Sequence, residues 1–397
     1  MTISDAEVRA LRRSTPGCAA GTTHLNNAGA ALMPTTVLDT VTNYMARESS
    51  VGGYEAQAEA LQKIDHVYTS LGNLIGASSD EIAVFDSATS AWQRAFYSLP
   101  IRAGERILTS SAEFAANHIA FLQVARRTGA TVEVVADDEH GALDLRALDR
   151  MIDESVAVVA VTWVPTNGGL INPAAQIGAI TRAHGVPFLL DACQAVGQIP
   201  IDVADLGCDL LTATGRKFLR APRGTGFLYV SGHTMNDLQP AFLDLFGAPW
   251  DIERGDYVLR SDARRFECWE ASFANRLGLG AAAELALEVG VDRIEARSRA
   301  LATSARKKLA ALPGVTVRDK GSDLAAIVSF SHSTVPATAI KDALSRHRIN
   351  VSVSPPSSTP VDAHRRHLPD LVRLSPHYYN TDEEVDKAID IVTRVAM

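Results

Sequence analysis

The chain has 397 residues, of which 46% are hydrophobic and 21% are charged, and its formal net charge is −8. This length exceeds what one compact core usually holds, so we expect one large and one smaller domain. The chain has no basic block and no Lys/Arg stripe interleaved with aromatic residues, and its apolar runs are strand-length, which argues against a nucleic-acid partner and against a membrane span.

The first two thirds of the chain read as helices followed by a βα alternation. Its first residues, MTISDAEVRALRRS, predict a short polar helix without the apolar core of a signal peptide. Residues 36–71 are largely helical, with an interruption at Gly52-Gly53. Strands are then expected at 82–85, 106–109, 131–135, 156–161, 188–190, 210–213 and 226–230, with helices such as 115–127 and 174–184 between them. This alternation predicts an α/β fold with a mostly parallel sheet covered on both faces.

The pattern changes after about residue 245. The segment FGAPWDIERGD reads as a loop, and residues 271–289 and 292–311 read as long helices. Strand-like runs at 325–330, 349–353 and 371–374 then alternate with helices, which predicts a small C-terminal α/β domain. We therefore divide the chain into an N-terminal segment (1–30), a large domain (31–250) and a small domain (251–397).

Three short segments carry polar groups that suit one ligand. The strand ending at Asp191 places a carboxylate at the carboxyl edge of a parallel sheet, where such folds bind ligands. The next strand is followed by Thr214, Gly215, Arg216 and Lys217. Ala88, Thr89 and Ser90 open a helix, whose N–H groups and dipole favour an anion. Taken singly, the three are equally typical of a strand-end acid, an exposed loop lysine and a routine helix cap.

Together the segments predict a ligand with an anion, a cationic ring nitrogen and a carbonyl, features that pyridoxal 5'-phosphate (PLP) combines. A desolvated lysine beside another cation has a depressed pKa and can form a Schiff base, which indicates Lys217 with Arg216 as its neighbour. Arg216 can also hold the phosphate. Asp191 would keep the ring nitrogen protonated, which makes the ring an electron sink. Lys217 and Asp191 are therefore the predicted catalytic residues.

Longer segments resemble the class V aminotransferase family, in order from about residue 22 to the C-terminus. They include HLNNAGAALMP, DSATSAWQRAFYSL, LLDACQAVGQIPIDV, TGRKFLRAPRGTGFLYV and VRLSPHYYNTDEEVDKAID. That family contains cysteine desulfurases, isopenicillin-N-epimerase-like enzymes and C–S lyases of ergothioneine-type pathways. The resemblance implies PLP fold type I, with a large domain, a smaller C-terminal α/β domain, and a homodimer whose active sites lie at the subunit interface.

The resemblance also implies how residues contact the cofactor. Lys217 would carry it, Asp191 would pair with the ring nitrogen, and Gln194 would bond the ring hydroxyl. The phosphate would be held by Ala88, Thr89, Ser90, Thr214 and Arg216, and Thr225 would reach the phosphate of the other subunit. Phe114 stands where desulfurases have a histidine that stacks on the ring. An aromatic ring still stacks there, but it cannot move protons.

The substrate side of the predicted site rests mainly on one arginine. Arg373 lies inside an apolar run, and the family uses this arginine to clamp a substrate carboxylate; a structural salt bridge is the alternative. Thr166 and Asn167, in the VPTNGG turn, would lie near the ring hydroxyl, or they serve the turn itself. Asn27 and Tyr54 are weaker substrate-side candidates, and a surface or capping role suits them equally.

The reaction type is predicted from the cysteines, Cys18, Cys193, Cys208 and Cys268. Their spacing is unpaired, which predicts a reducing cytoplasm and neither a disulfide framework nor a zinc site. Desulfuration needs a cysteine on a loop shortly before the clamping arginine, and NVSVSPPSSTPVDAHRRHLPDLVR has none. We therefore predict that the chain is not a persulfide-forming cysteine desulfurase. The leading prediction is β-elimination from an S-substituted cysteine (a C–S lyase) in secondary metabolism; an aminotransferase, an epimerase or a decarboxylating or deaminating enzyme is the alternative.

Overall fold

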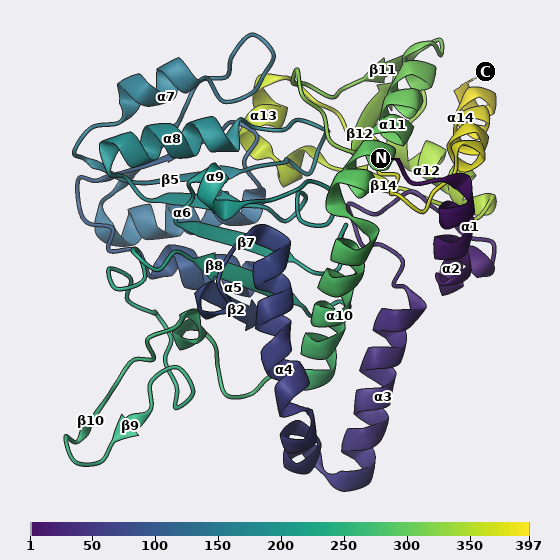
Figure 1. The fold of residues 1–397 in the computed structure, drawn as a ribbon. Helices are drawn as coiled ribbons and strands as arrows, with labels where there is room; N and C mark the ends of the chain where they lie inside the picture. Colours follow the sequence, from purple (N-terminus) through teal and green to yellow (C-terminus); the bar gives the residue numbers. More distant parts are fainter. Residues whose placement is uncertain (1, 397) are drawn as a thin grey trace.

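The fold is built on a seven-stranded sheet with the strand order β2-β8-β7-β6-β5-β3-β4 (Figure 1). A computed structural model describes residues 2–396 of the chain. The strands are β2 (Ile82–Phe85), β3 (Arg106–Thr109), β4 (Thr131–Val134), β5 (Val156–Thr162), β6 (Phe188–Asp191), β7 (Leu210–Thr214) and β8 (Gly226–Val230). Only β8 runs in the direction opposite to the other strands of this sheet. The predicted α/β fold with a mostly parallel sheet is confirmed.

Helices cover both faces of this sheet, which explains why its central strands are apolar at nearly every position. Leu189 and Leu190 are neighbours on β6, yet their buried side chains join two different hydrophobic clusters, one on each face. The connecting helices are α5 (Ala88–Tyr97), α6 (Ala115–Thr128), α7 (Leu145–Met151), α8 (Ala174–His184) and α9 (Val203–Leu206). Because the crossovers keep the strands parallel, β2, β3, β5, β6 and β7 all end at one edge.

A second, antiparallel sheet forms from the C-terminal part of the chain, in the order β11-β12-β15-β14. Its strands are β11 (Val315–Val317), β12 (Val328–His332), β14 (Ser352–Ser354) and β15 (Leu371–Leu374). The helices of this part are α11 (Val291–Ala310), α12 (Ala337–Arg346), α13 (Pro360–Arg365) and α14 (Asp382–Ala396). Near the N-terminus, α1 (Asp5–Arg13) and α2 (Pro16–Ala19) precede β1 (Thr23–His24), which pairs with β13 (Ile349–Asn350) and so ties the two ends of the chain together.

Two segments project from the body of the molecule (Figure 1). The helices α3 (Thr35–Val51) and α4 (Gly53–Ile75) form a long hairpin, and α10 (Phe273–Val289) packs against both. The second projection is a hairpin of β9 (Trp250–Asp251) and β10 (Asp256–Tyr257), within the segment that we predicted to be a loop. That prediction was wrong, because the Asp251 carboxylate accepts N–H bonds from Glu253 and Arg254 and closes a turn between two short strands.

Three short 3-10 helices complete the fold: η1 (Ser79–Glu81), η2 (Ala263–Phe266) and η3 (Pro356–Ser358). Among residues 2–396, no helix combines the length and the apolar character that crossing a membrane requires. Since α10 lies beyond residue 250 and packs against α3 and α4, the domain boundaries drawn from the sequence stay a prediction.

Candidate active site

A cavity of about 150 Å³ opens at the edge of the large sheet where the parallel strands end. Nine of the predicted site residues line it: Ala88, Thr89, Phe114, Thr166, Asp191, Gln194, Thr214, Arg216 and Lys217. They come from five separate strand ends or helix starts, so the fold, and not local sequence, brings them together. This position agrees with the general rule that open α/β sheets bind ligands at the carboxyl ends of their strands.

Lys217 lies three residues beyond the end of β7 and reaches into the cavity. Burial lowers the pKa of its ammonium to about 8, and the positive charges of Arg216 and Arg373 act in the same direction. Cys193 and Asp191 oppose this shift. A lysine with such a pKa has a large neutral fraction near neutral pH, so it can attack a carbonyl carbon or accept a proton.

Asp191 is the last residue of β6, and its side chain is almost fully buried. Its Oδ1 accepts the Cys193 N–H at 2.9 Å, and its Oδ2 accepts Asn117 Nδ2 at 2.8 Å. Two donors on fixed backbone elements therefore hold the carboxylate at the cavity wall, where it favours a cationic partner.

The N-terminus of α5 supplies donors for an anion. Ser87 caps the helix by accepting the Ser90 N–H at 3.1 Å, which leaves Ala88 and Thr89 at the cavity wall. A side chain on Gly226 would place its Cβ only 2.5 Å from the Ala88 nitrogen, so only glycine lets β8 pass this close to the helix start. The N–H groups and the dipole of a helix start favour a phosphate.

Ser90 and Thr225 lie on the other side of this helix start, in a neighbouring cavity of about 340 Å³. The Ser90 hydroxyl lies 3.0 Å from that of Ser87, and the Thr225 hydroxyl donates to the Pro222 carbonyl at 2.7 Å. Neither side chain lines the cavity around Lys217. The phosphate contacts predicted for Ser90 and Thr225 are therefore not tested by the residues that line this cavity.

Gln194 and Arg216 occupy the wall near the N-terminal segment. Gln194 Nε2 donates to the Ala28 carbonyl at 3.2 Å, while its Oε1 is buried and has no partner. Arg216 donates to the Gly29 carbonyl through Nη1. A buried acceptor without a donor is costly, which makes the Gln194 Oε1 a position for a ligand hydroxyl.

Arg373, on β15, approaches the cavity from the second sheet. Its Nη1 donates to the Thr166 carbonyl at 3.0 Å and to the Thr166 hydroxyl at 2.6 Å, and its Nε is buried without a partner. Burial, with a smaller contribution from Arg216, lowers the pKa of this guanidinium to about 10. Asn167 instead bonds Ser354 and Thr359, so it joins the two sheets.

The structure does not bring Asn27 and Tyr54 into this cavity. Asn27 is buried, and its amide is used by the Ser375 carbonyl at 2.7 Å and by the Tyr379 hydroxyl at 2.5 Å. Tyr54 is 74% exposed near the tip of the α3–α4 hairpin (Figure 1). Asn27 therefore has a structural role within the fold, and Tyr54 does not contact this cavity.

Several residues of the cavity wall were not predicted: Ser87, Trp92, Asn117, Thr162, Val164 and Cys193. The sequence holds one signal for Asn117, which follows Glu113 by four residues. Glu113 is an acid next to the predicted ring-stacking residue Phe114, and a buried acid needs a hydrogen-bonding partner such as Asn117. Phe114 itself lies at the N-cap of α6 and faces the cavity, where an aromatic ring can stack.

The residues present fit PLP. Lys217, Arg216 and Arg373 supply cationic groups, none of which forms an ion pair within residues 2–396. Gln194 Oε1 supplies a free buried acceptor, and the start of α5 supplies N–H donors for a phosphate. An anionic ligand with a hydroxyl and a ring nitrogen would satisfy groups that the protein alone leaves without partners.

Comparisons with known proteins agree with this assignment. The model of the family Aminotransferase class-V matches residues 23–388. The chain is 28% identical to a cysteine desulfurase of Escherichia coli O127:H6, with 100% of this chain and 99% of the relative covered. It is 26% identical to a probable cysteine desulfurase of Methanothermobacter thermautotrophicus, with 94% of each covered.

Solved structures show the same fold. A cysteine desulfurase from Thermococcus onnurineus has a TM-score of 0.90 at 23% identity, with 98% of both chains covered. A complex of the cystine C–S lyase C-DES with its reaction product cysteine persulfide has a TM-score of 0.86 at 22% identity, with 96% of this chain and 99% of the other covered.

These relatives correct one prediction. We predicted that the chain is not a persulfide-forming cysteine desulfurase, whereas its relatives over nearly the whole chain carry that name. The prediction assumed that the sulfur-accepting thiol must lie on one loop before Arg373. Cys193 lines the cavity beside Lys217, so a loop without cysteine excludes only one position for a thiol. The family model, which spans most of the sequence, and the fold together show that this chain belongs to the class V aminotransferase family and is a PLP-dependent enzyme.

Proposed function

We propose that this enzyme acts on L-cysteine and breaks its C–S bond. The observation that carries the proposal is that Lys217, Asp191 and Cys193 line one small cavity. Arg373, whose Nε has no partner, donates to Thr166 of the cavity wall. The relatives named cysteine desulfurases support the choice of L-cysteine as the substrate.

Arg373 is suited to bind the substrate carboxylate. It is buried, it has no carboxylate partner within residues 2–396, and its Nε is free, so an incoming carboxylate gains charge-assisted hydrogen bonds. The contacts with Thr166 hold the guanidinium plane in place before the substrate arrives. This preorganisation orients the amino group of the substrate toward Lys217.

Lys217 is suited to move the proton at Cα of the substrate. Its pKa of about 8, lowered mainly by burial, leaves enough neutral amine near pH 8 to accept a proton and enough ammonium to return it. Bound PLP supplies an electron sink for the charge that develops at Cα, and Asp191 would hold its ring nitrogen in the cationic form. Phe114 would cover the ring and exclude water, without moving protons itself.

The reaction balances with a thiol as the sulfur acceptor. L-Cysteine and a thiol R–SH give L-alanine and the persulfide R–S–SH, so one C–S bond breaks and one S–S bond forms. Of the two thiol hydrogens, one ends on Cβ of L-alanine and the other on the outer sulfur of the persulfide. Cys193 is the cysteine that lines the cavity. Burial raises the pKa of its thiol well above the usual value, so it needs a base such as neutral Lys217 before it can act.

Product analysis tests the proposal. The PLP-loaded enzyme is incubated with L-cysteine and a dithiol reductant, which releases transferred sulfur as sulfide. We expect L-alanine and sulfide in equal amounts. A reaction that yields pyruvate with sulfide, or no sulfur product at all, contradicts desulfuration. Cys193→Ala, assayed with and without the added thiol, shows whether the acceptor is this residue or a thiol from solution.

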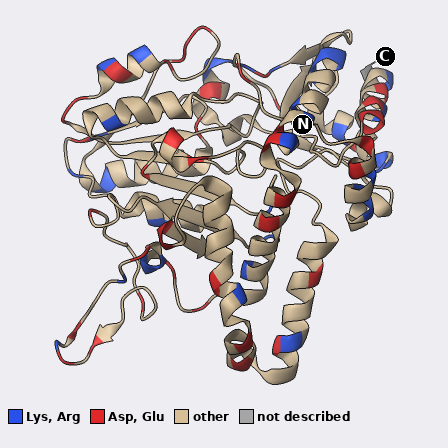
Figure 2. Cartoon of the chain, in the orientation of Figure 1, with Lys and Arg blue, Asp and Glu red and all other residues tan. Residues whose placement is uncertain are grey.

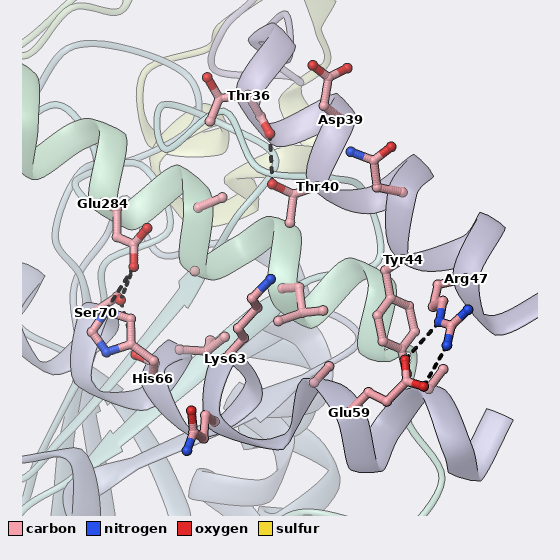
Figure 3. A pocket seen from close by; sticks show the side chains of 18 of the residues that line it. Thr36, Asp39, Thr40, Tyr44, Arg47, Glu59, Lys63, His66, Ser70 and Glu284 are labelled. Atoms are coloured by element: carbon pink, nitrogen blue, oxygen red, sulfur yellow. Dashed lines mark hydrogen bonds and ion pairs between the residues drawn. The ribbon is translucent and has the colours of Figure 1, made fainter. Parts of the chain in front are cut away.

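We also propose that the enzyme works as a homodimer. The α3–α4 hairpin exposes Leu38, Met45, Tyr54 and Leu61, and the 242–258 segment exposes Phe242, Leu245, Trp250, Ile252 and Tyr257. A groove of about 1000 Å³ runs between α3, α4 and α10 (Figure 3). Charges of both signs lie along the hairpin (Figure 2), among them the Arg47–Glu59 ion pair, so the surface suits a second copy of itself.

Light scattering tests this dimer. We expect twice the chain mass of 42.5 kDa for the wild type and the mass of one chain for Met45→Glu/Leu61→Glu. A wild-type enzyme of one chain mass contradicts the proposal. In a dimer, the exposed Tyr54 could contact the other subunit. Its predicted substrate role requires such a contact, because Tyr54 lies outside the cavity of its own chain. A cytoplasmic location and a place in secondary metabolism stay predictions.

A further inference from the structure

Glu113 is a buried carboxylate that lies just outside the wall of the cavity. It belongs to the connection between β3 and α6, directly before Phe114, and its side chain is only 2% exposed. Its oxygens accept the Thr162 N–H at 2.7 Å, the Thr162 hydroxyl at 2.6 Å and the Thr109 hydroxyl at 3.2 Å. No ion pair involving Glu113 occurs within residues 2–396, although an unpaired buried carboxylate is costly.

Asn117 connects Glu113 to Asp191. Its Nδ2 lies 2.8 Å from Glu113 Oε1 and 2.8 Å from Asp191 Oδ2, so both hydrogens of one amide group bind two different carboxylates. Asn117 lies on the first turn of α6, and Glu113 directly precedes the N-cap residue Phe114. These two hydrogen bonds therefore fix the Asp191 carboxylate relative to the β3–α6 connection.

We propose that Glu113 is a positioning residue for Asp191: together with Asn117 it fixes the Asp191 carboxylate and places a second negative charge behind it. This inference rests on the proposed role of Asp191 as the partner of the cofactor ring nitrogen. It goes beyond the proposed reaction, because Glu113 does not line the cavity and touches neither the cofactor position nor the substrate position.

The electrostatic setting makes Glu113 responsive to pH. Burial, and secondarily repulsion by Asp191, raises the pKa of Glu113 to about 7, while the donors from Thr162 and Asn117 oppose the shift. The titratable groups around it are Asp191 at the end of β6, and beyond Asp191 the thiol of Cys193 and the ammonium of Lys217. An ionised Glu113 thus raises the proton affinity of the cationic groups in the cavity.

The variant Glu113→Gln tests the proposal, because it keeps the shape and most hydrogen bonds but removes the charge. In the PLP-loaded enzyme, the pH midpoint of the visible absorption reports proton binding at the Lys217 nitrogen. We expect the midpoint to fall by about one pH unit in Glu113→Gln, a tenfold lower proton affinity. The matched control is Thr109→Val, which removes a neighbouring hydroxyl bond, leaves the charge in place, and should keep the wild-type midpoint.

A second variant keeps the test decisive if Glu113→Gln does not fold. Asn117→Leu removes the bridge without removing a charge, and we expect it to weaken PLP retention about tenfold in equilibrium dialysis, since Asp191 loses a charge-assisted hydrogen bond. A wild-type midpoint in Glu113→Gln, or wild-type retention in Asn117→Leu, overturns the positioning role. Wild-type protein that takes up PLP but does not cleave L-cysteine overturns the proposed reaction and leaves this spectral test intact.

Discussion

Two regions of the molecule that bury charged side chains differ in whether those charges have opposite partners. Next to β2, Arg276 Nη2 lies 2.8 Å from Glu267 Oε2, and Tyr68 bonds both side chains, at 2.6 Å and 3.0 Å. In the cavity, by contrast, Lys217, Arg216 and Arg373 form no ion pair within the described residues 2–396. In the first cluster the two opposite charges are paired within the protein, although Arg276 Nε has no hydrogen-bond partner, whereas the cationic groups of the second need an anionic ligand.

Burial without a carboxylate partner is not sufficient to identify a site, as Arg220 shows. This arginine is fully buried, but its three nitrogens donate to the Leu32 carbonyl, the Tyr378 hydroxyl and the Thr15 hydroxyl. The ring of Tyr379 also lies 4.3 Å from its guanidinium carbon. What distinguishes the cavity is therefore a group of unpaired cations together with free hydrogen-bonding capacity beside open space, as at Gln194 Oε1.

The largest effect is expected from Lys217→Ala. Loss of the amine removes both the covalent attachment of PLP and the proton carrier, so turnover of L-cysteine should fall at least about 10⁴-fold, or about 5 kcal/mol in the barrier. The control is Lys320→Ala, because Lys320 is a lysine that is already paired, with Asp137 at 2.9 Å and Asp362 at 2.8 Å. Initial rates of alanine formation measure both variants; a tenth of wild-type turnover in Lys217→Ala would rule out its role.

Breaking the buried ion pair between Glu267 and Arg276 should lower stability and leave the turnover of L-cysteine unchanged. Glu267→Gln leaves the buried Arg276 charge without its partner, and we expect the free energy of unfolding to fall by about 4 kcal/mol. Urea titration of the cofactor-free protein measures this loss. The fraction that stays folded should turn over L-cysteine at the wild-type rate, so a folded variant with impaired turnover would contradict the separation of the two regions.

The fold was largely predictable from the sequence because its signals are local. Each strand of the large sheet is a short apolar run next to a helical pattern, so the expected strand at 82–85 coincides with β2 and that at 226–230 with β8. The hairpin of β9 and β10 was missed because a side-chain turn at Asp251 makes it, without an apolar alternation. The strand expected at 349–353 is divided between β13 and β14, which pair with different partners.

The site was predictable only where a residue follows directly from a strand end. Lys217, Asp191 and Thr214 end or follow strands, so the parallel topology carries them to one edge. Asn117 was not predictable, because its role depends on the distance between α6 and β6, 74 residues apart in the sequence. Asn27 resembles a ligand-binding residue in sequence, yet the contacts with Ser375 and Tyr379 use its amide within the fold.

The pH dependence of stability tests whether Glu113, unlike the paired Glu267, is a buried carboxylate without an opposite charge. Its pKa rises from the ordinary 4.5 to about 7 on folding, so between these pH values the folded state binds more protons than the unfolded state. Stability therefore falls as pH rises from about 4.5 to about 7, by up to about 3 kcal/mol, and levels off above. Glu113→Gln cannot titrate, so the stability difference between wild type and variant should follow this curve in urea titrations of the cofactor-free protein. A difference that does not change with pH would contradict the buried, unpaired state of Glu113.

The smallest effect is expected where charge is kept and only geometry is lost, in Arg373→Lys. A lysine ammonium retains the positive charge but cannot give two parallel hydrogen bonds to a carboxylate or hold Thr166 at the same time. The loss of one charge-assisted bond is worth about 2 kcal/mol, so KM for L-cysteine should rise about 30-fold. Because the carboxylate is bound equally before and during the reaction, kcat should stay near the wild-type value.

The matched control for Arg373 is an arginine whose charge is already paired. Arg306 lies 2.6 Å from the Asp319 carboxylate and also bonds the carbonyls of Ala325 and Ile327. Arg306→Lys should therefore lower stability and leave KM unchanged. A lower kcat with an unchanged KM in Arg373→Lys would contradict the role in substrate binding. The guanidinium would then act on the reacting atoms, and its free Nε would donate to a group that becomes charged only in the transition state.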